Sequence, residues 1–126
     1  MMLRIGSTVL GVEDVTRAVN FWTSAIGYEL REAPEDDTWA TLISPNAASS
    51  QLALMKSVTA VQAHPRVHLD LYADNRESEV ARLIELGARN VEWDSYGESP
   101  DFVVLEDPDG NRFCVIEKDE HWIGFR

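Results

Sequence analysis

The sequence is poor in cysteine, in basic residues and in long apolar runs, and each shortage excludes a class of protein. The single cysteine, Cys114, excludes an internal disulfide, and with no recognisable signal peptide at the start of the sequence this favours a reducing cytoplasm. No apolar run approaches the roughly 20 residues that span a bilayer. The 11 basic residues face 22 acidic ones, a net charge of −11. This balance argues against nucleic acid and anionic membranes as partners, since both require clustered cations.

The composition that remains suits one folded domain spanning residues 1–126. The chain is 44% hydrophobic, which is enough to form a core without stabilising disulfides or structural metal ions. Two stretches that lie 60 residues apart each contain an aspartate followed 13 residues later by a glycine. These residues are Asp14 and Gly27 in the first stretch and Asp74 and Gly87 in the second. Aspartate can cap the start of a helix and glycine can end one. We therefore expect one helix in each half of the chain.

Short apolar stretches before and after each expected helix are typical of strands. They cover residues 7–12, 28–32, 38–44 and 50–56 in the first half and 66–72, 89–93, 101–106 and 111–117 in the second. The sequence thus predicts an α+β fold of two βαβββ modules. The modules comprise residues 1–57 and 66–118, with a linker at 58–65 and a tail at 119–126.

The segment "EDPDGNRFCVIEK" combines a tight turn with a strand. Proline and glycine suit the turn, and Asp107 and Asp109 are expected to bond to the local backbone, so the turn needs no functional explanation. A similar turn, "SPN", lies 63 residues earlier, and at that offset Gln51 pairs with Cys114.

The repeat and the segments "DVTRAVNFWTSAIGYEL", "HLDLYADN", "ARLIELGA" and "DPDGNRFCVIE" resemble the vicinal oxygen chelate superfamily. Glyoxalase I, extradiol dioxygenases, and fosfomycin and bleomycin resistance proteins belong to it, and the chain is most similar to its small glyoxalase-like members. The resemblance implies a curved, half-open mixed-sheet barrel with the helices outside. It also implies a metal ion held by His, Gln or Glu from the first and last strand of each module, and by analogy a homodimer.

The metal positions carry over one by one onto His68, Cys114, Gln51 and either Ser7 or Thr8. One imidazole and one thiol are too few good donors for the hard cations of this superfamily. The resemblance therefore predicts a degenerate site, with no cofactor expected; His68, Cys114 and Gln51 are the candidate ligands if a divalent metal binds. Alternatively, Cys114 is a small buried apolar residue and Gln51 an ordinary polar wall residue.

A row of polar side chains follows from alternation along the strand expected at 66–72. His68, Asp70 and Tyr72 share one face, which we expect to line the cavity. His68 and Asp70 are the candidate catalytic residues, with His68 as a base or metal ligand that Asp70 tunes. Alternatively, the two satisfy each other as a structural polar pair. Alternation places Val67, Leu69 and Leu71 on the opposite face, against a helix.

Aromatic residues are the second clue to a pocket for a small-molecule ligand. Trp39 and Phe102 are expected to line it together with Tyr72, Gln51 and Cys114, because such pockets combine aromatic walls with a few polar groups. Trp22 is expected in the core. His64 and His121 are expected in the linker and on the surface.

Three hypotheses follow for the function. The first is a lyase or isomerase acting on a small carbonyl- or oxyanion-bearing metabolite. The second is a non-catalytic protein that sequesters an aromatic or cationic compound, as bleomycin resistance proteins do. The third is a subunit or regulatory domain without a ligand.

Overall fold

The computed structural model describes residues 2–118, and the expected tail at 119–126, with His121, lies outside the described residues. The chain divides into two compact units, Met1–Ala60 and Val61–Arg126, which are described separately. Neither helix in the described range is long and apolar enough to cross a bilayer.

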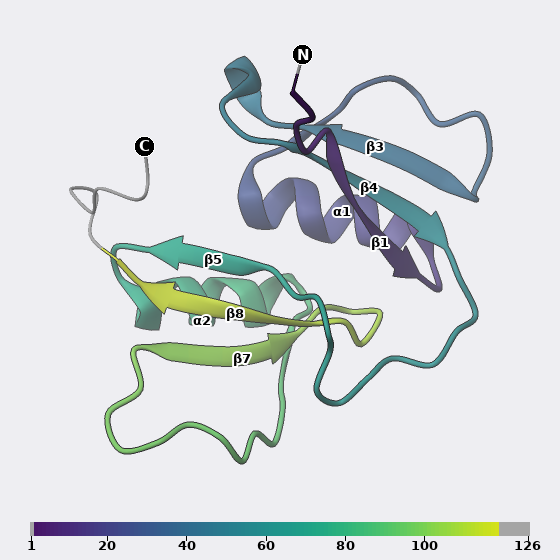
Figure 1. Ribbon diagram of the computed structural model, residues 1–126. Coiled ribbons are helices and arrows are strands. Elements are labelled where there is room, and N and C mark those ends of the chain that lie inside the picture. Colours follow the sequence, from purple (N-terminus) through teal and green to yellow (C-terminus); the bar gives the residue numbers. More distant parts are fainter. Residues whose placement is uncertain (1, 119–126) are drawn as a thin grey trace. The chain divides into compact units, whose positions relative to one another are not determined.

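The first unit contains one helix and a four-stranded mixed sheet (Figure 1). Strand β1 runs parallel to β4, and β3 pairs antiparallel with β4 and β2, which gives the order β1-β4-β3-β2. A short 3-10 turn, Pro45–Ala47, precedes β4. The elements are β1 (Ser7–Val12), α1 (Val15–Ile26), β2 (Glu29–Leu30), β3 (Trp39–Ile43) and β4 (Gln51–Lys56).

The second unit repeats this topology. Strand β5 runs parallel to β8, and β7 pairs antiparallel with β8 and β6, which gives the order β5-β8-β7-β6. The elements are β5 (Asp70–Ala73), α2 (Arg76–Leu86), β6 (Arg89–Asn90), β7 (Phe102–Glu106) and β8 (Arg112–Glu117). The α+β fold of two βαβββ modules that the sequence predicts is confirmed.

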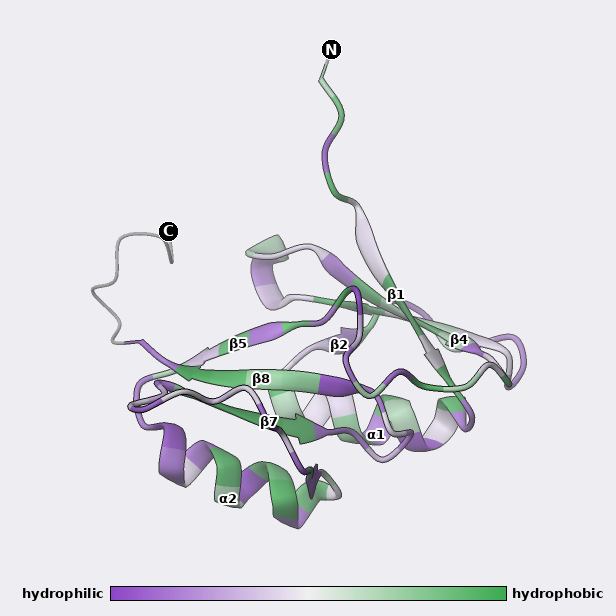
Figure 2. Ribbon diagram, turned by 60° about the horizontal axis from the view of Figure 1, so that its bottom comes forward, coloured by the Kyte–Doolittle hydropathy of each residue, from purple (hydrophilic) through white to green (hydrophobic). Residues whose placement is uncertain are grey.

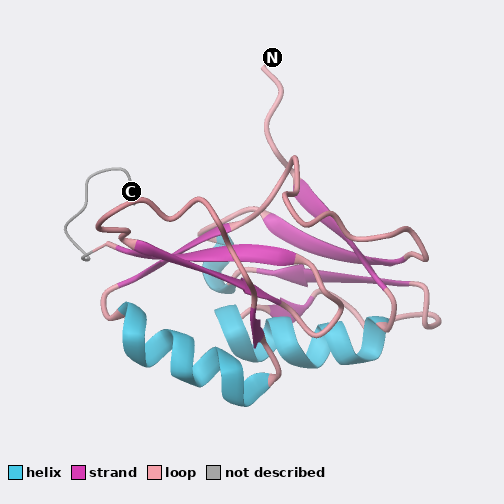
Figure 3. Ribbon diagram, turned by 90° about the horizontal axis from the view of Figure 1, so that it is seen from below, coloured by secondary structure: helices cyan, strands magenta, loops and turns pink. Residues whose placement is uncertain are grey.

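Each helix covers one face of its own sheet (Figure 3). In the first unit α1 packs on β3 and β4 and buries Trp22, as expected, with Leu42 and Leu54 among the least exposed residues of the sheet. In the second unit α2, which carries both polar and apolar stretches in Figure 2, packs on β8, and Leu83 and Phe113 are buried. The opposite face of each sheet is not covered by the helix of its own unit.

The helix ends show one difference from the expected pattern. Asp14 caps α1 by accepting a hydrogen bond from the backbone N–H of Arg17 at 3.0 Å, and Gly27 ends it in the left-handed conformation. In the second unit Asn75 is the cap, accepting from the N–H of Ser78 at 3.0 Å. The expected cap Asp74 is therefore wrong by one residue. Asparagine caps as well as aspartate, so composition alone did not separate the neighbours.

This correction gives a direct stability test. We expect Asn75→Ala to lower the free energy of unfolding by about 1 kcal/mol, because the first turn of α2 loses its side-chain acceptor. Asp74→Ala is the matched control and should change it by less than about 0.5 kcal/mol. Urea denaturation of the three proteins measures both values, and a larger loss in Asp74→Ala would contradict the assignment.

Strand β5 is shorter than the expected strand at 66–72. It begins only at Asp70, so His68 lies two residues before it, and Val67, expected against a helix, is 78% exposed. The ladder nevertheless continues for one bond, since the N–H of Cys114 donates to the carbonyl of Leu69 at 2.9 Å.

Candidate functional site

Strand β8 lies between β5 and β7, and this pairing brings distant residues together. Cys114 pairs with Asp70 on the parallel side and with Val104 on the antiparallel side. Paired residues in neighbouring strands point to the same face of a sheet. Cys114 and Asp70, 44 residues apart in the chain, are therefore neighbours on one face.

This face is the one turned away from helix α2. Phe113 and Val115, on either side of Cys114, are buried. Glu117 accepts a hydrogen bond from the backbone N–H of Arg76, the first residue of α2, at 3.1 Å. Odd-numbered residues of β8 thus face the helix, and alternation places Cys114 on the opposite face.

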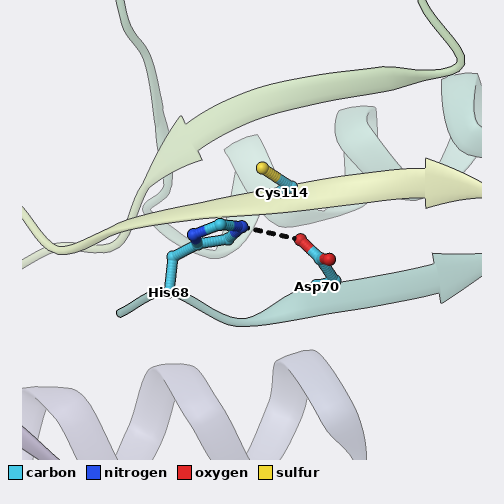
Figure 4. Close-up of side chains that lie close together, drawn as sticks. All are labelled: His68, Asp70 and Cys114. Atoms are coloured by element: carbon cyan, nitrogen blue, oxygen red, sulfur yellow. Dashed lines mark ion pairs between the residues drawn. The ribbon is translucent and has the colours of Figure 1, made fainter. Parts of the chain in front are cut away.

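Three chemically different side chains converge on that face (Figure 4). His68 Nε2 lies 3.0 Å from Asp70 Oδ1. One potential ligand atom of each of His68, Asp70 and Cys114 lies within 4.8 Å of those of the other two. The side chains of His68 and Asp70 are 43% and 45% exposed, so a small molecule can reach them. We refer to these three residues as the His68 cluster.

The environment of Cys114 keeps its side chain protonated. Burial first, then the charge of Asp70 and a hydrogen bond to its carboxylate, raise the pKa of the Cys114 thiol to about 11. Since the thiolate is the reactive form of cysteine, the free side chain is a poor nucleophile at neutral pH. The arrangement does not support a cysteine nucleophile.

An apolar row adjoins the His68 cluster on the same face. Tyr72 and Phe102 both pair with Ile116, so the three side chains lie side by side. Tyr96 packs on Phe102 with 5.2 Å between ring centroids, and its hydroxyl accepts from the N–H of Val104 at 2.9 Å. The expected substrate-binding residues Tyr72 and Phe102 are thus next to the expected catalytic pair, as alternation indicates.

The metal-ligand set of the superfamily does not fit the residues of the first unit. Gln51 lies opposite Ser7 in the β1–β4 ladder, so the side chain beside it there is a hydroxyl. The amide oxygen of Gln51 accepts from Arg31 Nη1 at 3.1 Å, and its Nε2 donates to the carbonyl of Gly6 at 3.3 Å. The amide oxygen of Gln51, which a metal ion would need as its ligand, is thus already hydrogen-bonded to a guanidinium, and the positive charge of this group would repel the metal ion. We therefore derive no step through a metal held by donors from both modules.

Trp39 lies in the first unit beside a separate hollow. Trp39 is 43% exposed, and its ring is held by a hydrogen bond from Nε1 to Thr41 Oγ1 at 3.0 Å. The hollow has a volume of about 390 Å³, and the acidic loop that follows β2 forms much of its wall. Its lining includes Arg31, Glu32, Pro34, Glu35 and Asp36.

Two features of the site were missed by sequence reasoning. Asp70, considered only as a partner of His68, occupies the position equivalent to Ser7, since the 63-residue offset that pairs Gln51 with Cys114 also pairs these two. Using that offset instead of 60 would have revealed it. Arg31, which binds Gln51 across 20 residues of sequence, left no signal in the pattern.

Comparison with known proteins agrees with the repeated fold. A family model described as "Glyoxalase-like domain" matches residues 7–116. A search of curated proteins finds no match. Among solved structures, a possible glyoxalase from Bacillus cereus aligns with a TM-score of 0.66 and 20% identity over 91% of this chain and 99% of its own.

Two further structures illustrate the breadth of the fold. A glyoxalase/bleomycin resistance protein/dioxygenase family enzyme from Burkholderia phytofirmans has a TM-score of 0.67 and 15% identity over 89% of this chain and 96% of its own. The trypanothione-dependent glyoxalase I of Leishmania major has a TM-score of 0.62 and 18% identity over 92% of this chain and 87% of its own. At these identities the structures share the fold alone, whereas the family model covers most of the sequence. The chain therefore belongs to the glyoxalase-like family of the vicinal oxygen chelate superfamily.

Proposed function

We propose that the chain is a lyase or isomerase that acts on a small carbonyl- or oxyanion-bearing metabolite at the His68 cluster. The observation that carries the proposal is the convergence of an imidazole, a carboxylate and a thiol within 4.8 Å on an accessible sheet face. Reactive centres are recognised by such convergence beside a surface that can hold substrate. Tyr72, Phe102 and Ile116, which are neighbours in the sheet, would form that surface here.

The roles follow from the contacts. With Nε2–H donating to Asp70, the lone pair on Nδ1 of His68 would take a proton from the substrate, so that His68 acts as a general base. Asp70, 3.0 Å from Nε2, would hold the ring in one orientation and tautomer. The apolar row would position the body of the substrate. We place His68 as the catalytic residue and Asp70 as the residue that positions it.

The test is a turnover assay with a panel of small α-oxo aldehydes, their thiol adducts and hydroxy acids. We expect His68→Ala and Asp70→Asn each to lower kcat/KM at least about tenfold, because the first removes the general base and the second loosens its orientation. His64→Ala is the matched control, since His64 makes an equivalent contact to Asp94 at 3.1 Å outside the cluster. An equal loss in the control, or no turnover of any panel member by the unmodified protein, would contradict the proposal.

A second candidate function, sequestration of an aromatic cation, is favoured by the hollow beside Trp39. A half-exposed indole attracts a cation, and the carboxylates of Glu35 and Asp36 on the same wall add to this attraction, whereas Glu32 is paired with Arg31. Binding to the folded state would raise the melting temperature and quench tryptophan fluorescence. Trp39→Phe should abolish the quenching. Trp93→Phe is the control, because Trp93 stacks on His64 instead.

The homodimer and the cytoplasmic location belong to the same proposal. A homodimer is supported only by analogy with the superfamily, and light scattering on the purified protein tests it. The cytoplasmic location is supported by the lone cysteine and the absence of disulfide partners.

A further inference from the structure

The misfit of the superfamily's metal-ligand set leaves a different set of donors in the second unit. The superfamily arrangement requires donors from two modules, but Gln51 is engaged by Arg31. The His68 cluster, in contrast, lies wholly within the second unit and contains three donors of different types. Asp70 is the first residue of β5 and His68 lies two residues before it, whereas Cys114 lies opposite Asp70 on β8.

We propose that His68, Asp70 and Cys114 together bind one thiophilic divalent cation of the zinc type, without a ligand from the first unit. The inference deepens the proposed function and rests on it only for the use of the cation in the reaction. The binding itself is argued from the geometry and chemistry of the three side chains.

The geometry suits a tetrahedral cation. Zinc binds imidazole nitrogen and carboxylate oxygen at about 2.0–2.2 Å and thiolate sulfur at about 2.3 Å, so neighbouring donors in a tetrahedron are roughly 3.2–3.8 Å apart. His68 Nε2 and Asp70 Oδ1 are 3.0 Å apart, and all three donors lie within 4.8 Å of one another. Side-chain movement of about an ångström would close the site.

The donor chemistry decides which cation is favoured. One sulfur, one nitrogen and one oxygen form a borderline-soft set, which favours zinc or cobalt over magnesium or calcium. The cation would displace the proton of the Cys114 thiol to solvent. The resulting thiolate and the Asp70 carboxylate would together balance the charge of a dication, in a protein whose net charge is −11. Three protein ligands also leave one position open on the exposed side, as catalytic zinc sites do. A cation there would polarise a substrate oxygen, and His68 would then act as its ligand instead of as the base.

The two units carry different side chains at equivalent positions of their ladders. By register Asp70 is the counterpart of Ser7, and Cys114 is the counterpart of Gln51. The same two places thus hold a hydroxyl and an engaged amide in the first unit but a carboxylate and a thiol in the second. Only the second unit has at these places two side chains that can bind a cation as anions, with His68 beside them.

Cobalt titration of the metal-free full chain tests the inference. Because Cys114 is the only cysteine, any thiolate-to-cobalt charge-transfer band reports this residue. We expect one cobalt ion per chain with such a band, displaced by zinc. Cys114→Ser should remove the band, and His68→Gln and Asp70→Asn should weaken cobalt binding at least about tenfold. Circular dichroism confirms that each variant is folded.

Gln51→Ala is the control that distinguishes the two arrangements, and it should leave the cobalt affinity and the band unchanged. Absence of a charge-transfer band at saturating cobalt, binding that survives Cys114→Ser, or a tenfold loss in Gln51→Ala would overturn the inference. Turnover by chelator-treated protein would remove the cation from the reaction while the proposed function stands. Cobalt binding without turnover of any panel member would contradict the proposed function while the cation site stands.

Discussion

Phe113→Ala is expected to lower the free energy of unfolding by about 3–5 kcal/mol, the range for removing a buried phenylalanine ring. Phe113 is 2% exposed on strand β8, opposite Leu105, which is fully buried. The residue lies on the face that α2 covers, so its loss opens a cavity between helix and sheet. Since natural domains have a total stability of about 5–15 kcal/mol, the variant is expected to be marginally folded.

Phe102→Ala is the matched control for this prediction. Phe102 lies on the other face of the same sheet, half-buried against Tyr96, so its removal should cost only about 1–2 kcal/mol. Guanidinium denaturation followed by circular dichroism measures both variants. Equal losses would show that the face away from α2 is packed as tightly as the core, in conflict with its use as a binding surface.

Asp107→Ala is the second substitution for which we expect a large effect, a loss of about 2–4 kcal/mol. Asp107 is fully buried, and its Oδ1 accepts from the backbone N–H groups of Asp109 at 3.0 Å and Asn111 at 2.8 Å. Alanine would leave these donors without that acceptor, and a buried unsatisfied donor costs about 1–3 kcal/mol. The turn between β7 and β8 would lose its fixed shape.

Asp107→Asn separates the hydrogen bonds from the charge. Its amide oxygen can still accept from both N–H groups. The loss of unfolding free energy should therefore be smaller than for alanine by at least about 1 kcal/mol. The remaining cost arises because its NH₂ group would meet Asn111 Nδ2, which donates to Asp107 Oδ2 at 3.4 Å in the structure. Thermal or urea unfolding measures the difference, and identical losses would mean that the backbone contacts contribute little.

Local patterns predicted most elements of the fold because their causes are local. Alternation located β7 and β8, and the helix ends at Gly27 and Gly87 follow from the positive φ that glycine permits. The errors are also local in origin. Asp74 and Asn75 are equally good caps, and tertiary pairing with β8 determined where β5 begins.

The candidate site was only partly predictable because it depends on register. The pair His68 and Asp70 follows from sequence spacing, but the approach of Cys114 to Asp70 depends on a parallel ladder between strands 44 residues apart. The bond from Arg31 to Gln51 arises from long flexible side chains that leave no periodic signal. Both contacts matter most for the choice between a two-module metal site and the His68 cluster.

A crystal structure of the protein grown with zinc, with anomalous data collected on both sides of the zinc absorption edge, would be decisive. Our interpretation expects one strong anomalous peak about 2.0–2.3 Å from donor atoms of His68, Asp70 and Cys114. A peak coordinated by Gln51 instead, or a zinc-saturated crystal in which these three side chains point away from one another, would contradict it.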